Sequence, residues 1–318
     1  MERIPVETWH IIFAYACIDG GFTARALSRT CRYFREASKL VRYQSLKLEG
    51  LHQLHAFYAI AANEACLGIR SLFISDVTPA SSGDSEDAGQ QPAALRGRWP
   101  REQVQERDAL IKTILAIAVQ TLEILFLDLR HGRNYLFAPA DLPVLRELTV
   151  YGTYDSSTDS ITAALQPFAQ LRRLHFNGSY DILSQGSNLV AALAEVNRLA
   201  PSLTHLGCTD GNIIQLHQIA SALGIVSNSR PIRDSIPRTV THIYFNDQRL
   251  VHLMYSQGAR SLRSLVVREA SRKTTSNEEV LKCWSAATQG QEWFWASAVN
   301  IALWNRNFPR LDRLHLMI

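Results

Sequence analysis

The sequence predicts an α/β fold: a small all-helical module followed by an irregular solenoid of parallel strands with outer helices. Three observations lead to this prediction. Two amphipathic segments with a helical period open the chain. Behind them, a short apolar pattern of strand length recurs many times. Helical patterns lie between its copies, and strands that alternate with helices form parallel sheets. We place the helical module in residues 1–48 and the array in residues 49–318.

The two helical segments of the module are expected at residues 6–17 and 23–41. Pro5 precedes the first segment, where a proline removes no needed hydrogen bond. Gly20 and Gly21 separate the two segments, and glycine readily adopts the left-handed conformation that ends many helices. Thr23 is the candidate N-cap of the second segment, because a threonine hydroxyl can accept a bond from a free helical amide.

The second helical segment has an apolar side and a basic side, at spacings of three and four residues. The basic side carries Arg25, Arg29, Arg32, Arg35, Lys39 and Arg42. A solvated helix face is the first interpretation of this stripe, and an acidic protein partner is the second. Nucleic acid is the third, but no aromatic residues are interleaved and the net charge of the chain is only +4.

The module also carries the sequence pattern of a known small domain. The matching pieces are Ile4-Pro5-Val6-Glu7, Ile11-Ile12-Phe13-Ala14-Tyr15, Ala26-Leu27-Ser28-Arg29-Thr30-Cys31-Arg32-Tyr33-Phe34-Arg35 and Tyr43-Gln44-Ser45-Leu46. Over residues 4–48 the chain resembles an F-box, in the form common among mushroom-forming fungi. It departs from the family pattern at Ile4, Ala16 and Thr30, where leucine, leucine and valine are usual.

The F-box resemblance implies a partner. F-box domains dock a Skp-type adapter, which links them to a cullin–RING ubiquitin ligase, and the rest of the chain then selects a target protein. By position, the residues that would form or support the docking surface are Ile4, Pro5, Ile11, Ile12, Leu27, Cys31 and Phe34. Small helices leave an apolar face that a partner must cover. The alternative is that these residues are core contacts to the following array.

The array consists of a repeated pattern in which apolar residues occupy the first, fourth and sixth positions. Its nine copies begin at Tyr43, Ile69, Leu122, Leu145, Leu171, Leu203, Val240, Leu262 and Leu311. Helical patterns lie between copies, for example in residues 54–66 and 104–119. The array resembles a degenerate leucine-rich-repeat fold. The family's asparagine or cysteine after the strand is missing from the copies, so the hydrogen bonds of that loop must be made in another way.

Two stretches interrupt or end the array. Residues 77–100 are polar and rich in glycine and serine, and we expect a flexible surface insertion there. Residues 276–308 hold four of the six tryptophans of the chain. We expect this stretch to form a helical cap that closes the open end of the array, as terminal repeats must. An aromatic ligand cage is the alternative interpretation.

One face of the predicted sheet is a candidate surface for a target protein. Side chains alternate across a strand, so the residues between the apolar positions share the opposite, concave face. The candidates on this face are Phe126, Tyr151, Arg173, His175, His205, His242, Tyr244 and Arg268. Aromatic residues and arginine are the usual anchors of protein interfaces. An ordinary solvated sheet face is the alternative.

The sequence predicts no catalytic, cofactor or metal site. The motifs of nucleotide-binding loops, serine hydrolases and zinc proteases are absent from the sequence. His205 and His242 share a register on neighbouring predicted strands, but no cysteine or acid joins them at matching positions. The chain is therefore expected to be a binding protein and not an enzyme.

The location expected for the chain is the cell interior, in the cytoplasm or nucleus. The five cysteines are odd in number and show no C-x-x-C spacing, which argues against a disulfide framework. The longest apolar stretch, residues 11–18, is too short to cross a membrane. The expected function is that of a substrate-receptor subunit of an SCF-type ubiquitin ligase. The alternative is a non-catalytic repeat scaffold or interaction protein with no role in ubiquitin transfer.

Overall fold

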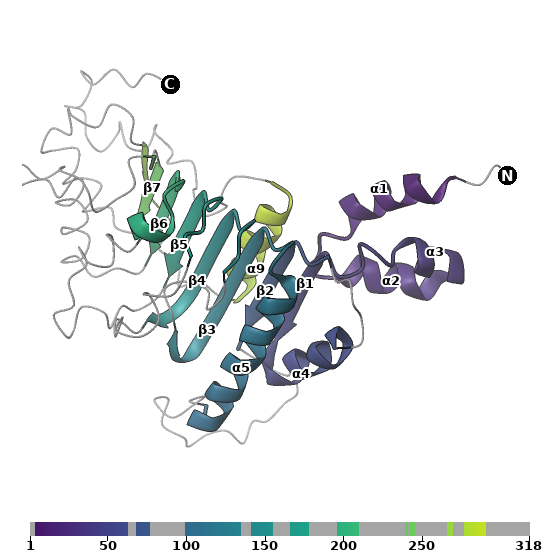
Figure 1. Ribbon diagram of the computed structural model, residues 1–318, viewed down its shortest axis with the longest axis horizontal. Coiled ribbons are helices and arrows are strands. Elements are labelled where there is room, and N and C mark those ends of the chain that lie inside the picture. The colour runs from purple at the N-terminus through teal and green to yellow at the C-terminus, as the bar shows by residue number, and fades with distance from the viewer. Residues whose placement is uncertain are drawn as a thin grey trace, which may run out of the picture.

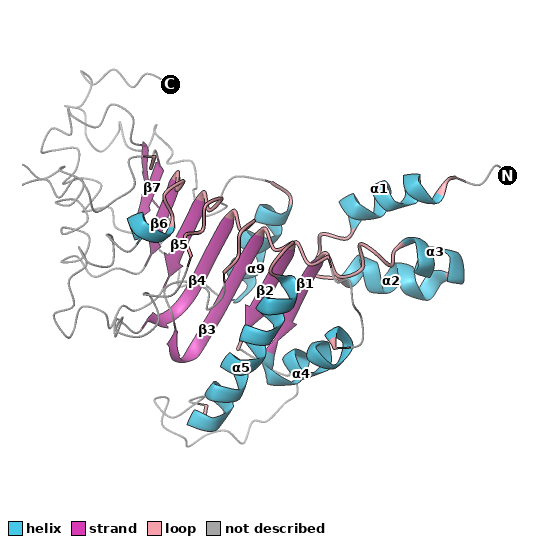
Figure 2. Ribbon diagram, viewed as in Figure 1, coloured by secondary structure: helices cyan, strands magenta, loops and turns pink. Residues whose placement is uncertain are grey.

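The computed structural model describes residues 4–62, 68–76, 99–134, 141–154, 166–177, 196–209, 239–240, 242–245, 266–269 and 277–290. Three helices open these residues, strands and helices then alternate, and a run of strands and a last described helix follow (Figures 1 and 2). The elements are α1 (Val6–Ala16), α2 (Phe22–Thr30), α3 (Arg32–Ala37), β1 (Ser45–Glu49), α4 (Gly50–Ala61), β2 (Ser71–Ser75), α5 (Arg101–Ala118), β3 (Ile124–Asn134), β4 (Glu147–Tyr154), β5 (Arg173–Asn177), β6 (His205–Thr209), β7 (His242–Phe245), β8 (Val266–Glu269) and α9 (Asn277–Thr288).

Within the described part of the chain, eight strands form one sheet in the order β1 to β8, and every neighbouring pair is parallel. The predicted α/β class with parallel strands is therefore confirmed. Each of the first eight copies of the repeated pattern supplies one strand, and the ninth copy lies outside the described residues. The second apolar residues of the first seven copies are side by side, at Leu46, Leu72, Leu125, Leu148, Leu174, Leu206 and Ile243.

The eighth copy departs from this register. Val267, its third apolar residue, pairs with Ile243, so β8 is shifted by two residues relative to the repeated pattern. A shift of two keeps every residue on its predicted side of the sheet, because strand side chains alternate with a period of two.

The outer helices α4 and α5 cover one face of the sheet (Figure 1). Leu54 of α4 and Ile114 of α5 are fully buried, in one apolar cluster with the inward residues of the strands. The entry to each strand is held by a backbone ladder. The carbonyl of Gln44 accepts from the amides of Arg70 and Ser71, and the Arg70 carbonyl accepts from those of Glu123 and Ile124. The same pair of hydrogen bonds to one carbonyl recurs at β4, β5 and β6. The backbone itself therefore fixes how neighbouring copies stack.

Three helices open the described chain, where the sequence predicted two. The expected segment 23–41 is wrong as a single helix, because Cys31 has an extended backbone that separates α2 from α3. The Cys31 thiol accepts from the amide of Phe34 at 3.5 Å and so caps α3. Thr23 is not the N-cap of α2. It lies inside the helix, and its amide and hydroxyl donate to the carboxylate of Asp19.

The last described helix, α9, lies against the face of the sheet opposite α4 and α5 (Figure 1). Trp284 packs there with Phe73 of β2, Phe126 of β3 and Tyr151 of β4. The expected cap at residues 276–308 is therefore wrong for its described part, residues 277–290, because this helix lies beside the first strands and not at the β8 end (Figure 1). The predicted insertion at 77–100 falls outside the described residues, apart from Trp99 and Pro100.

In the residues that the structure describes, no helix combines the length and the apolar character needed to cross a bilayer.

Candidate functional site

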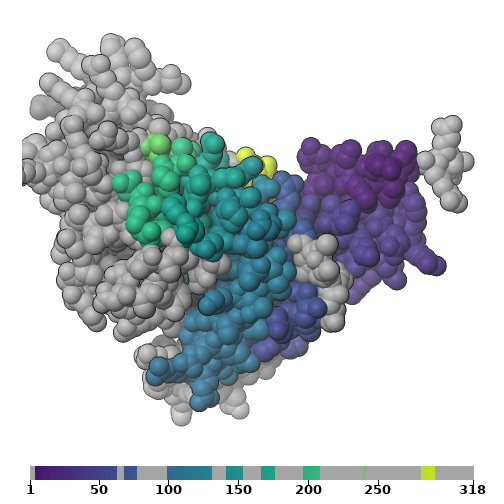
Figure 3. Space-filling view, viewed as in Figure 1, coloured from purple at the N-terminus to yellow at the C-terminus, as the bar shows by residue number. Residues whose placement is uncertain are grey.

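The helical module has an apolar core of its own. Phe13, Cys17, Ala24 and Ala37 form a buried cluster that is separate from the core of the sheet. The rings of Trp9, Phe13 and Phe34 lie 4.8 to 5.6 Å apart between centroids, and the Phe13–Phe34 pair meets edge to face. Figure 3 shows the module as a lobe beside the sheet.

The surface of this module carries a concentration of exposed apolar side chains. We call them the exposed apolar set, and they are Ile4, Val6, Ile11, Ile12, Tyr15, Phe22, Tyr33 and Leu40. Elsewhere in the described chain, the large apolar residues exposed to this degree are Tyr58 and Ile60 of α4. Isolated exposed apolar residues are common on soluble proteins, but a concentration of them marks an interaction surface.

Helix α1 shows this character most clearly. Its inner side buries Phe13 and half-buries Trp9. On its outer side, Ile11 is 61% exposed and Tyr15 is 79% exposed, at the four-residue spacing of one helix face. Large apolar side chains on a helix normally face a packing partner. The outer side of α1 therefore has the composition of a surface that a second protein covers.

The structure separates the predicted adapter-binding residues into two groups. Ile4, Pro5, Ile11, Ile12 and Cys31 are exposed. Leu27 and Phe34 are half-buried and pack against the module core, so they support the surface from beneath.

Sequence reasoning missed several members of the exposed apolar set, among them Tyr15 and Phe22. The four-residue spacing of Ile11 and Tyr15 was the signal that could have identified Tyr15.

The basic stripe is only partly free for a partner. The Arg35 Nε donates to the carbonyl of Ser28 at 2.9 Å, and Arg42 Nη2 donates to the carbonyl of Arg35 at 3.1 Å. These two cations therefore bond carbonyls in the last turns of α2 and α3, where such groups lack intrahelical donors. Arg25, Arg29 and Arg32 are exposed.

Part of the predicted target-binding face is buried in the structure. Phe126, Tyr151 and His175 are buried, so the prediction that they face a target protein is wrong. Phe126 and Tyr151 form an apolar cluster with Trp284 of α9, and the His175 ring meets Tyr151 edge to face at 5.6 Å. The alternation of side chains predicts the correct side of the sheet for these residues. It does not reveal that α9, which is distant in the sequence, covers that side. Burial lowers the pKa of His175 to about 3, so this imidazole is neutral at physiological pH.

The remaining candidates lie further along the sheet. Arg173 is half-buried and forms an ion pair with Glu147 at 3.4 Å, and His205 shares a 2.8 Å hydrogen bond with the hydroxyl of Thr204. His205 and His242 pair in the β6–β7 register, as the sequence predicted. His242 and Tyr244 lie on β7 and Arg268 on β8, and their side chains are outside the description.

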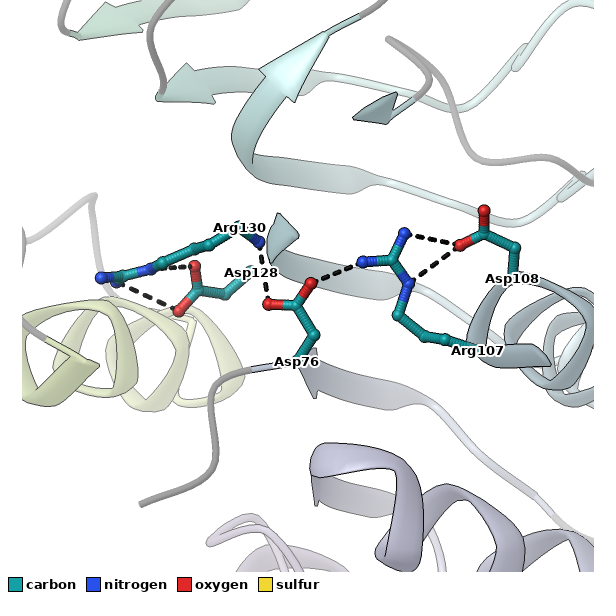
Figure 4. Close-up of polar contacts among 5 residues, drawn as sticks. All are labelled: Asp76, Arg107, Asp108, Asp128 and Arg130. Carbon is teal, nitrogen blue, oxygen red and sulfur yellow. Dashed lines mark hydrogen bonds and ion pairs between the residues drawn. The ribbon is translucent and has the colours of Figure 1, made fainter. Parts of the chain in front are cut away.

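A largely buried network of charges joins α5 to Asp76, just after β2, and to the middle of β3 (Figure 4). Arg107 donates to Asp76 and Asp108, and Asp76 accepts the amide of Arg130 at 2.8 Å. Asp128 pairs with the guanidinium of Arg130 at 2.9 Å. Burial raises the pKa of the Asp128 carboxyl, while the hydrogen bond and charge of Arg130 oppose that rise. Each buried carboxylate has a partner, which is the arrangement of a structural network.

The buried Asp76 also links neighbouring copies of the repeated pattern. Its carboxylate, just after β2, accepts the backbone amide of Arg130 in the following copy. No group of three or more histidine, cysteine or acidic residues that could hold a metal occurs in the described ranges.

No protein-family model matches the chain, and no curated protein matches it.

Proposed function

We propose that this chain is the substrate-receptor subunit of an SCF-type cullin–RING ubiquitin ligase. In this proposal, α1, α2 and α3 form an F-box that docks a Skp-type adapter, and the parallel strands belong to a leucine-rich-repeat-like solenoid that holds the target. The observation that supports this proposal most directly is the outer side of α1. Ile11 and Tyr15 are exposed there, while the inner side of the same helix is already buried.

The energy available at such a surface is sufficient for a specific complex. Covering a largely exposed isoleucine or aromatic side chain contributes roughly 1–3 kcal/mol. Several members of the exposed apolar set together therefore reach the range of micromolar binding, about 8 kcal/mol, after the costs of association are met. The exposed cations Arg25 and Arg29 on α2 would favour an adapter surface with acidic residues.

Target binding must use the part of the array that α9 does not cover. Arg173 and His205 are half-buried on β5 and β6, and His242, Tyr244 and Arg268 follow in register. We propose this end of the sheet as the target-binding surface. The mechanism is positioning, because the chain would raise the local concentration of the target beside a ubiquitin-loaded enzyme.

The test uses the full-length chain and a purified Skp-type adapter in a titration calorimeter. We expect a one-to-one complex at micromolar concentration or tighter for the native chain. The double variant Ile11→Asp/Ile12→Asp should lose at least about tenfold in affinity, because it places charges in an apolar interface. The matched control is Tyr58→Asp/Ile60→Asp, which puts the same charges on exposed apolar positions of α4 and should bind as the native chain does.

Two outcomes would count against the proposal. If the native chain does not bind the adapter at micromolar concentration, the chain is a repeat scaffold without a ligase role. If the Ile11→Asp/Ile12→Asp variant loses its near-ultraviolet circular dichroism, these residues belong to the core of the molecule and not to a docking surface.

A further inference from the structure

One side chain of α9 lies where the sheet meets the helical module. Trp284 is 3% exposed, and its ring centroid lies 5.7 Å from that of Phe73 on β2. On the module side, a Cβ placed at Gly20 would lie 3.2 Å from two carbons of the indole. One turn later, the hydroxyl of Thr288 donates to the carbonyl of Ile18 at 3.1 Å. Helix α9 therefore contacts the sheet and the α1–α2 loop at the same time.

The loop at Gly20 is shaped for this contact. Gly20 has a φ of +74°, a conformation that glycine adopts without the steric cost of a side chain. A Cβ there would also lie 3.0 Å from the Cβ of Lys47 on β1, so the loop has no room for a side chain between α9 and the sheet. Its amide donates to the hydroxyl of Ser45 at 3.2 Å, which attaches the same residue to β1.

The module has few other attachments among the described residues. Its buried cluster contains no residue of the sheet, so the two bodies do not share an apolar core. The amide group of Gln44, just before β1, donates to the carbonyls of Ala14 and Cys17. Two units joined by so small a contact move relative to one another unless a further element holds them.

We propose that α9 is a clamp that fixes the orientation of the helical module against the sheet, with Trp284 as its positioning residue. Helix α9 lies against the first strands, packs next to Phe73 and contacts the α1–α2 loop, which is itself bonded to β1. The clamp itself stands on these contacts alone. Its consequence rests on the proposed function: the clamp would hold the adapter-binding lobe at a fixed angle to the target-binding end of the array.

The clamp is tested by a single-molecule distance measurement on the full-length chain. Fluorophores are attached at Glu36 on α3 and Lys112 on α5, two exposed positions, through genetically encoded azides. The native chain should give one narrow distance distribution. Trp284→Ala should broaden it by about twofold or more, because the module then loses the indole that packs between Gly20 and Phe73. Tyr58→Ala, which removes an exposed aromatic ring from α4, is the control and should leave the width unchanged.

Two further variants separate loss of the clamp from loss of the fold. Gly20→Ala attacks the same contact from the module side while Trp284 stays in place, and it should broaden the distribution as well. Trp284→Phe keeps an aromatic ring and removes an indole N–H that has no hydrogen-bond partner in the described structure, so the narrow distribution should be retained. Equal widths in the native chain, Trp284→Ala and Gly20→Ala would overturn the proposal.

Adapter titration of the same variants distinguishes the clamp from the proposed function. Trp284→Ala should bind the Skp-type adapter as the native chain does, because the exposed apolar set is untouched. If no variant binds the adapter but the distance distributions behave as stated, the clamp stands and the ligase proposal fails. If adapter binding is normal and Trp284→Ala keeps the native width, the ligase proposal stands and the clamp is wrong.

Discussion

The guanidinium of Arg107 donates to the carboxylate of Asp76, and neither side chain has any surface exposed to solvent. Arg107 belongs to the outer helix α5, and Asp76 follows strand β2. The pair therefore joins the helical layer to the edge of the sheet where strands end. Because Asp76 also accepts the amide of Arg130, the same carboxylate links the second and third copies of the array.

Removing the arginine of this pair should destabilise the array strongly. Arg107→Leu leaves the Asp76 charge buried without its guanidinium, and breaking a buried pair in this way costs about 3–5 kcal/mol. Urea unfolding followed by circular dichroism measures the loss. Arg101→Leu, an exposed arginine on the same helix, is the control and should change the free energy of unfolding by no more than about 0.5 kcal/mol.

A second variant identifies the cause of that loss. Adding Asp76→Asn to Arg107→Leu removes the buried charge, so the double variant should be more stable than Arg107→Leu alone. Equal destabilisation by Arg107→Leu and Arg101→Leu would show that the buried pair does not carry the stability assigned to it.

The buried His175 predicts a loss of stability in acid. Burial lowers its pKa from 6.5 to about 3. Below pH 6.5, His175 is therefore protonated in the unfolded chain but stays neutral in the folded chain down to about pH 3. The contribution is complete above pH 6.5 and decreases by about 1.4 kcal/mol for each pH unit below it. Urea titrations of the native chain and of His175→Gln between pH 7 and pH 5 measure the effect. A slope as steep in His175→Gln as in the native chain would contradict it.

The separate core of the helical module predicts a local effect of one core substitution. Phe13→Ala removes a buried ring that contacts Trp9 and Phe34, and such changes cost about 3–5 kcal/mol. We expect faster amide hydrogen exchange in α1 to α3 and unchanged exchange in β2 and β3, because the sheet has its own core. Mass spectrometry of the exchanged protein resolves the two regions. Uniformly faster exchange would mean that the module and the sheet unfold as one unit.

The two cysteines of the module should differ in reactivity. Cys17 is buried, and burial, with a smaller effect from the charge of Asp19, raises the pKa of its thiol to about 11. At pH 8 only about one Cys17 in a thousand is the reactive thiolate. Cys31 is exposed. Iodoacetamide should therefore alkylate Cys31 well before Cys17 in the native protein, as peptide mass spectrometry can show, and both at similar rates in urea. Equal rates in the native protein would contradict the buried position of Cys17.

Much of the fold was predictable because the signals are local. A strand shows itself by alternation and a helix by a period of 3.6, and both depend only on neighbouring residues. The copies that begin at Ile69 and Leu122 therefore indicated β2 and β3 correctly. The break at Cys31 was missed because its apolar spacing continues that of a helix, whereas the structure places its extended backbone at the N-cap of α3.

In the candidate site, too, the features set by neighbouring residues were predictable and those set by distant contacts were not. The four-residue spacing of Ile11 and Tyr15 indicates that the outer side of α1 is apolar. Local helix geometry is enough to place both residues on one side. The burial of Phe126 and Tyr151 depends on Trp284, which is far away in the chain. A self-comparison of the sequence identifies what repeats, and α9 is not part of a repeat.

By itself, the sequence determined the order of the strands, the inward and outward sides of strands β1 to β6, and the apolar character of the helical module. These properties depend on residues that are close together in the chain. Only the tertiary structure decided that α9 covers the first strands, that Asp76 and Arg107 share a buried bond, and that Gly20 meets Trp284. The physical reason is that burial results from contacts between distant segments, and no periodicity in the sequence records which segments meet.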